Sequence, residues 1–184
     1  MTDTAHHCDE RIRSIRPRDR STVNRLGTSL FQPYGHYGSA LDVWLRQPGV
    51  KGYVSEIEGI RTTGFVLVAT RLAQLPAGHS YILGIGVEAD RQGLGLGRRL
   101  LATAIDDLEQ EALSLQLSRL QLNVAEDNER ALRLFRSLGF CQVRGATVAY
   151  GGGQRGITME RPLGPREPHG HVLNQPGTDP DLLH

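Results

Sequence analysis

The sequence has few cysteines, little net charge and no long apolar run. Its 184 residues include two cysteines, Cys8 and Cys141, too few for a disulfide framework and suited to a reducing cytoplasm. The formal net charge is +1, so neither nucleic acid nor an anionic membrane is expected as the main partner. No stretch approaches the roughly 18 apolar residues of a membrane helix, and the polar start MTDTAHHCDE is not a secretory signal. These absences predict a cytoplasmic protein that does not bind membranes.

The composition predicts one globular domain with loose ends. Apolar residues make up 39% of the chain and charged residues 22%, which allows a sizeable core. Residues 1–10 are predicted to be a flexible N-terminus, and residues 164–184, rich in Pro, Gly and charge without periodicity, a disordered tail. The domain is therefore expected over residues 11–163. The adjacent His6, His7 and Cys8 lack further ligands at a suitable spacing, so no metal site is predicted.

The hydrophobic pattern predicts helices and strands in mixed order. Expected strands are 12–15, 51–58, 63–70, 81–87, 120–124, 141–150 and 157–160, and expected helices are 19–30, 41–45, 96–115 and 128–138. The resulting order, β-α-α-β-β-β-α-β-α-β-β, is neither a strict β-α alternation nor all-β. This order indicates an α+β fold with a mixed sheet.

The stretch RQGLGLGRRLL at 91–101 places three glycines at alternate positions between a predicted strand and a predicted helix. Because the first N–H groups of a helix lack partners and the helix dipole is positive there, such a junction binds anions, usually phosphate. A Walker loop is excluded by the missing Lys and Ser/Thr, and G-x-G-x-x-G by Arg98 or Leu100 at its third glycine. From this stretch alone, a glycine-rich turn without a ligand stays an alternative.

The surroundings of this loop resemble a known family. The segment VEADRQGLGLGRRLL at 87–101 is similar to V-x-P-x-x-[RQ]-G-x-G-[IL]-G-x-x-L-L, with Ala89 where proline is common. The segment LNVAEDNERALRLFRSLGF at 122–140 resembles L-x-V-x-x-x-N-x-x-A-x-x-L-[YF]-x-x-x-G-F. Both patterns belong to the GCN5-related N-acetyltransferase (GNAT) superfamily, closest in style to its ribosomal-protein and peptide Nα-acetyltransferases. The resemblance covers roughly residues 12–163.

The resemblance implies a fold and a cosubstrate. It implies a mostly antiparallel sheet of six to seven strands with helices on both faces, and a V-shaped splay between the fourth and fifth strands. It also implies acetyl-CoA, with its arm on the splayed strand and its diphosphate on the loop. The cofactor positions carried over are Ile85, Val87, Gln92, Gly93, Leu94, Gly95, Leu96, Gly97, Arg98, Asn128 and Phe135.

The glycines in the predicted strand 81–87 and the residue Asn128 can also be explained by a purely structural role. Gly84 and Gly86 inside the strand indicate a bulge or a close backbone approach, although they can also simply ease packing. Asn128 matches an asparagine that contacts the CoA arm in relatives, and it is equally suited to cap the following helix.

The catalytic positions depart from the family pattern. Phe135 stands where relatives often have a tyrosine that protonates the leaving thiolate, and Asn123 where the ribosomal-protein branch has a glutamate base. Tyr150 lies where relatives often have a tyrosine near the acceptor, so the candidate catalytic residues are Tyr150 and Asn123. Tyr34, Tyr37 and Tyr150 are the expected acceptor contacts, in a region that also holds Trp44. His79 and Glu88, which flank the fourth strand, are weaker candidates with surface roles as the alternative.

Two functions follow from these residues. The first is an acetyl-CoA-dependent N-acetyltransferase that transfers an acetyl group directly to a primary amine of a peptide, protein or small molecule in a ternary complex. The alternative is a non-catalytic acyl-CoA-binding sensor or interaction module, favoured by Phe135 and Asn123. The sequence does not identify the amine, and it allows a monomer or a homodimer.

Overall fold

The computed structural model describes residues 10–35, 37–57, 61–72 and 75–164. The flexible terminus predicted for residues 1–9 and the tail predicted for 165–184 lie outside the described residues. Glu10, placed at the end of that terminus by the sequence, instead begins the first strand, where it pairs with Ile57.

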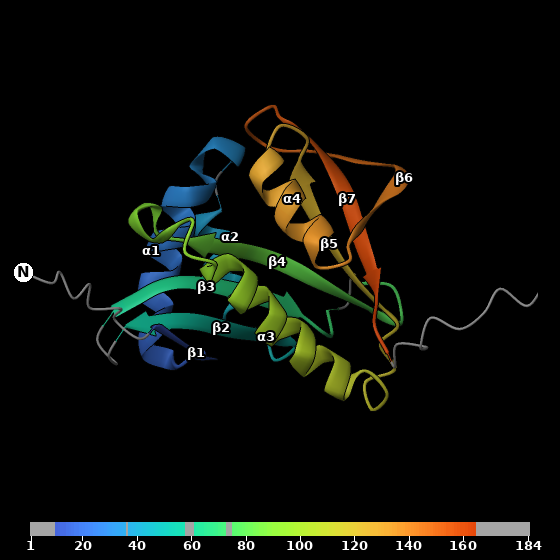
Figure 1. The fold of residues 1–184 in the computed structure, drawn as a ribbon, viewed down its shortest axis with the longest axis horizontal. Coiled ribbons are helices and arrows are strands. Elements are labelled where there is room, and N and C mark those ends of the chain that lie inside the picture. The colour runs from blue at the N-terminus through green and yellow to red at the C-terminus, as the bar shows by residue number, and fades with distance from the viewer. Residues whose placement is uncertain (1–9, 36, 58–60, 73–74, 165–184) are drawn as a thin grey trace, which may run out of the picture.

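Within the described residues, seven strands and four α-helices follow one another along the chain in the predicted order (Figure 1). The strands are β1 (Glu10–Ser14), β2 (Val50–Ile57), β3 (Arg61–Ala69), β4 (His79–Val87), β5 (Arg119–Ala125), β6 (Cys141–Ala149) and β7 (Arg155–Pro162). The helices are α1 (Arg20–Phe31), α2 (Gly38–Trp44), α3 (Leu96–Glu111) and α4 (Glu129–Ser137), with 3-10 turns at Pro17–Asp19, Gln32–Tyr34 and Ala89–Arg91.

The strands form one sheet in the order β1-β2-β3-β4-β5-β7-β6. Every neighbouring pair is antiparallel except β4 and β5, which are parallel. That parallel pairing covers only His79–Ile82 of β4 and Arg119–Leu122 of β5, whereas β5 pairs with β7 along its whole length. β4 and β5 therefore separate after Ile82, which confirms the predicted splay.

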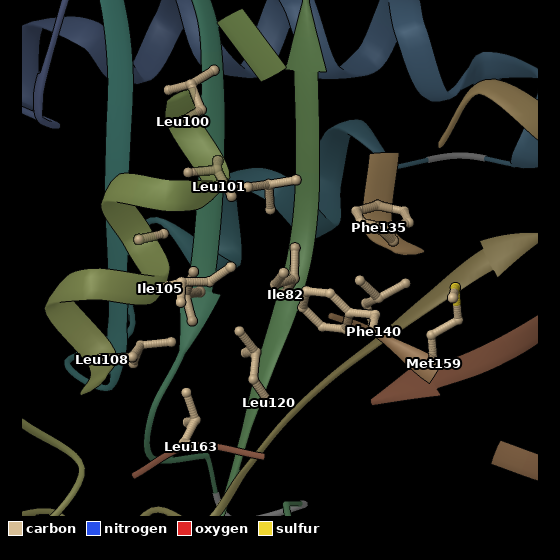
Figure 2. Packing of buried hydrophobic residues seen from close by; sticks show 14 of the residues in the cluster. Ile82, Leu100, Leu101, Ile105, Leu108, Leu120, Phe135, Phe140, Met159 and Leu163 are labelled. Atoms are coloured by element: carbon tan, nitrogen blue, oxygen red, sulfur yellow. The ribbon is translucent and has the colours of Figure 1, made fainter. Parts of the chain in front are cut away.

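Two apolar clusters cover opposite faces of this sheet. Successive residues of a strand point to opposite faces, and β3 shows this directly. Val66 and Val68 belong to the cluster that packs under α3 and α4, while Phe65 and Leu67 belong to the cluster under α1 and α2. Figure 2 shows the first cluster, in which α3 and its leucines lie over β2 and β3, with Ile82 of β4 and Phe140 beside them. The helices packed on both faces hold the strands of the sheet in place, and so they also hold β4 and β5 apart where these strands separate.

The glycines of β4 serve both predicted purposes. The β3–β4 register shifts between Leu67 and Val68, so β4 carries a bulge at Leu83 just before Gly84. A Cβ on Gly84 would lie 3.1 Å from the ring of Phe31, and a Cβ on Gly86 would lie 2.6 Å from Leu30. The missing side chains thus let α1 settle directly on the splayed part of β4.

Candidate functional site

The splayed half of β4 presents unpaired backbone groups. The N–H of Glu88 donates to the carbonyl of Thr63 at 2.8 Å, on the β3 side. Because peptide groups alternate in direction along an antiparallel strand, the N–H groups of Ile85 and Val87 point the other way, toward the gap left by β5. An extended chain with amide groups could pair with this edge as an added strand does.

The glycine loop continues this edge into the N-terminus of α3. Gly93 (φ 90°) and Gly95 (φ 78°) both adopt left-handed backbone conformations, and nothing lies within 4 Å of where their Cβ atoms would be. The N–H of Arg99 is bonded to the carbonyl of Gly95 at 3.0 Å. The earlier N–H groups of the helix, at residues 96–98, precede the first helical bond and stay available to an anion.

A groove of about 420 Å³ joins the β4 edge to the loop. We call it the loop groove. All the cofactor positions predicted from the sequence line it except Leu94, whose side chain is 59% exposed. Arg91 and Arg130 line it too, so it offers cationic side chains as well as free N–H groups. These features suit a long ligand that carries both amides and phosphates.

Gln92 and Asn128 both bond to other parts of the groove wall. Gln92 donates to the carbonyl of Val87 at 2.9 Å and accepts from Arg130 at 2.7 Å, which ties the loop to α4. Asn128 accepts from the N–H of Ala131 at 3.1 Å, so the predicted N-cap role is confirmed. Its amide nitrogen donates to the hydroxyl of Tyr34 at 3.4 Å.

A second, smaller cavity of about 130 Å³ lies deeper in the splay. We call it the tyrosine chamber, because it is lined by Tyr34, Tyr37 and Tyr150, the three residues that the sequence predicts to contact an acceptor. Asn123 lines it from β5. Trp44 is not one of its lining residues and instead packs in the cluster beneath α1 and α2, with its ring 6.4 Å from that of Tyr37.

Burial in the chamber raises the pKa of Tyr37 and of Tyr150. Burial is the main cause that raises the pKa of Tyr150 to about 12, and the nearby Tyr37 and Tyr34 raise it further. Burial also raises the pKa of Tyr37. Tyr81, which the sequence did not single out, has a pKa raised by burial and then by Tyr150 and Tyr37. At neutral pH these hydroxyls are proton donors and not bases.

Asn123 and Phe135, the two positions that depart from the family pattern, both have polar or packing partners in the structure. Asn123 accepts a hydrogen bond from the hydroxyl of Thr158 at 2.9 Å, so its amide nitrogen remains as a donor. Phe135 is 4% exposed and packs edge-on against Phe140, with ring centroids 5.9 Å apart, and its edge reaches both the loop groove and the tyrosine chamber. Neither side chain can remove a proton from an amine.

The flanking candidates lie elsewhere. Glu88 is ion-paired with Arg61, and His79 begins β4 opposite Arg119, and neither lines the groove or the chamber. Among the described residues, no group of three or more His, Cys, Asp or Glu side chains could hold a metal ion. The helices in the described part of the chain are too short or too polar to cross a membrane.

The splayed sheet, the groove along its edge and the glycine loop define a fold with a groove between two separated strands. A family model described as Acetyltransferase (GNAT) family matches residues 20–140. The chain therefore belongs to the GNAT family, as the two motifs predicted.

Curated relatives of two kinds are similar to the chain. It is 37% identical over 101 residues to a mycothiol acetyltransferase of Kocuria rhizophila, covering 53% of this chain and 31% of that protein. It is 34% identical over 91 residues to the N-alpha-acetyltransferase RimI of Mycobacterium tuberculosis, covering 50% of this chain and 52% of that protein. The chain thus spans about a third to a half of the length of these relatives.

Solved structures share the fold at lower identity. The ribosomal-protein-S18-alanine N-acetyltransferase from Escherichia coli aligns with a TM-score of 0.67 and 20% identity, over 89% of this chain and 100% of that chain. NAA60 of Arabidopsis thaliana, in complex with acetyl-CoA, aligns with a TM-score of 0.69 and 15% identity, over 84% and 99%. These likenesses confirm the predicted α+β architecture.

Proposed function

We propose that the protein is an acetyl-CoA-dependent N-acetyltransferase that moves an acetyl group directly to a primary amine within a ternary complex. One observation carries this proposal: the loop groove and the tyrosine chamber meet. Tyr34, Ile85, Asn128 and Phe135 line both cavities. The thioester of a cosubstrate bound in the groove would then lie next to the amine of an acceptor bound in the chamber. Direct transfer requires these two groups to be adjacent.

The chain's own residues are suited to hold acetyl-CoA. Ile85 and Val87 would pair with the amides of its arm, and the N–H groups of the loop and of residues 96–98 would bind its diphosphate. Backbone donors supply this binding without a lysine or a metal ion. The named relatives and the NAA60 complex support acetyl-CoA as the cosubstrate.

The chemistry needs a polarised carbonyl and a proton for the leaving thiolate. The N–H of Val87 would donate to the thioester oxygen, where negative charge develops. Tyr150 would donate to the thiolate, because a phenol hydroxyl carries its proton at neutral pH. The acceptor must arrive as a neutral amine or lose its proton to water, since Asn123 and Phe135 accept none.

Acetyl-CoA binding and thiol release test this function. At 100 times its Kd, acetyl-CoA should stabilise the fold by about 2.7 kcal/mol, which raises the melting temperature by roughly 5 to 10 °C. A screen of peptide and small-molecule amines should then release free thiol. An unchanged melting temperature would contradict the proposal. Clear binding without turnover on any amine would favour the alternative, a non-catalytic acyl-CoA-binding module.

Removing the Tyr150 hydroxyl should slow transfer without weakening cosubstrate binding. For Tyr150→Phe we expect kcat to fall roughly 10- to 100-fold, at the low end for a general acid because a thiolate leaves fairly readily on its own. Steady-state kinetics with acetyl-CoA and one active amine would measure this. Tyr53→Phe is the control, because Tyr53 is a buried tyrosine on β2 that hydrogen-bonds Asp107 away from the chamber. Equal kcat in both variants would remove Tyr150 from the mechanism.

A further inference from the structure

Two loops from opposite sides of the splay touch each other. One is the β6–β7 turn at Gly151–Gly153, and the other is the 3-10 turn Gln32–Tyr34 after α1. The N–H of Gly152 donates to the carbonyl of Tyr34 at 3.3 Å, and the amide of Gln154 donates to the carbonyl of Pro33 at 2.7 Å. The rings of Tyr34 and Tyr150 lie 5.3 Å apart beside these bonds. We call this contact the hairpin bridge.

The hairpin bridge rejoins the two arms of the V. On one arm, α1 rests on β4, where Phe31 fills the space left by Gly84. On the other arm, the β6–β7 turn extends from strands that follow β5 in the sheet. In Figure 1 the blue segment after α1 and the orange turn approach each other near the top of the view. The arms that separate after Ile82 are thus tied again beyond the tyrosine chamber.

The bridge depends on glycine at one position. A Cβ on Gly152 would lie 2.0 Å from the carbonyl oxygen of Pro33, a distance that no side chain can tolerate without movement of the backbone. Gly153 differs, because its φ of 89° serves the turn and nothing lies within 4 Å of its Cβ position. Gly152 is therefore required for the contact between the loops and Gly153 only for the shape of the turn.

The bridge also limits the size of the chamber. An apolar cavity of about 150 Å³ holds one molecule the size of benzene. The tyrosine chamber has about 130 Å³, and part of that faces the loop groove through Phe135 and Asn128. The other oxygen of this contact, Oε1 of Gln154, is buried without a hydrogen-bond partner among the described residues. The bridge therefore depends on the bonds to Tyr34 and Pro33.

We propose that Gly152 is a specificity-determining residue, because the hairpin bridge that it permits restricts the acceptor to compact amines with a small group beside the nitrogen. This inference rests on the proposed acetyltransferase function. It names the class of acceptor within that function and leaves the cosubstrate unchanged. The bulk of a large acceptor would have to displace Tyr34 or Tyr150, and so break the bridge.

A series of amino-acid amides tests the size limit. With the wild type, kcat/KM should fall about tenfold or more from glycinamide to phenylalaninamide, a typical effect of filling a closed pocket. Gly152→Ala should reduce this ratio by about tenfold, because the methyl group pushes Pro33 away and opens the bridge. Gln154→Ala removes the second hydrogen bond without a backbone clash and should shift the ratio in the same direction. Gly145→Ala, which places the same kind of left-handed strain in β6 away from the bridge, should keep the wild-type ratio.

The kcat/KM ratios of the wild type and the variants decide whether the bridge limits acceptor size. An unchanged ratio in both Gly152→Ala and Gln154→Ala would overturn it, as would a wild type that uses small and large amides equally well. Those results leave the acetyltransferase proposal standing, since turnover is observed. If no amide is acetylated, hydrogen exchange of the whole chain still tests whether the hairpin bridge forms in solution. The Gly152 amide should exchange slowly in the wild type and faster in Gln154→Ala, and fast exchange in the wild type would overturn the bridge itself.

Discussion

Replacing Gly95 with glutamate should weaken acetyl-CoA binding about 100-fold or more. The new carboxylate would stand at the start of α3, beside the free N–H groups of residues 96–98. There it would compete for those donors and repel the diphosphate. Two unit charges 4 Å apart near a protein surface repel by on the order of 4 kcal/mol, and partial screening still leaves a large loss of affinity. Isothermal titration with acetyl-CoA would measure the change.

The fold should tolerate this substitution. Nothing lies within 4 Å of a Cβ at Gly95, so the cost is the left-handed backbone, about 1 to 2 kcal/mol for an ordinary residue. Gly145→Glu is a matched control, since Gly145 has a φ of 73°, equally open surroundings and a place in β6 outside the groove. Both variants should lose similar stability, and only Gly95→Glu should lose binding. Comparable affinity in the two variants would show that the loop does not hold the diphosphate.

The sequence predicted the fold because its signals were local. The glycine loop, the α3 leucines and the cap at Asn128 each depend only on residues that are close in sequence. Their positions could therefore be predicted from the spacing of residues along the chain. The β4 glycines marked both the bulge and the approach of α1. The family motifs then supplied what spacing alone could not, namely which two strands separate.

The sequence missed features that depend on distant pairs. Tyr81 reads as an ordinary strand residue, and only the folded chain brings it near Tyr150 and Tyr37. The hairpin bridge joins Gly152 to Tyr34 across more than a hundred residues, and a Gly-Gly-Gly run indicates a turn but not what the turn touches. A third case is the buried ion-pair network around Glu56, which no sequence motif marks.

Glu56 is 2% exposed and binds three arginines from the N-terminal segment. Arg13 is the most buried of them and also pairs with Asp19 at 2.7 Å, while Arg11 and Arg18 are more than half exposed. This network fixes β1 and the turn at Pro17–Asp19 to β2. Because α1 begins at the next residue, the network also sets where α1 lies, and hence where α1 delivers Tyr34 to the splay.

Glu56→Gln should therefore destabilise the fold by about 3 kcal/mol at pH 7. This is the lower end for breaking a buried ion pair, because two of the arginines are exposed and Asp19 still pairs with Arg13. Urea denaturation would measure the free energy of unfolding. Glu129→Gln is the matched control, since Glu129 forms an exposed pair with Arg133 on α4 and should change stability by less than about 0.5 kcal/mol.

The pH dependence of this loss of stability tests whether the charge of Glu56 causes it. Hydrogen bonds from Arg13, then from Arg11, lower the pKa of Glu56 from 4.5 to about 2 in the folded chain. A carboxyl with a lowered folded pKa stabilises the fold above its unfolded pKa, and that contribution is lost as the pH falls through its folded pKa. The stability difference between wild type and Glu56→Gln should thus be full at pH 7 and shrink steadily from pH 4.5 to about 2. A difference that stays constant over that range would mean that packing, and not the charge of Glu56, holds β1 and α1 in place.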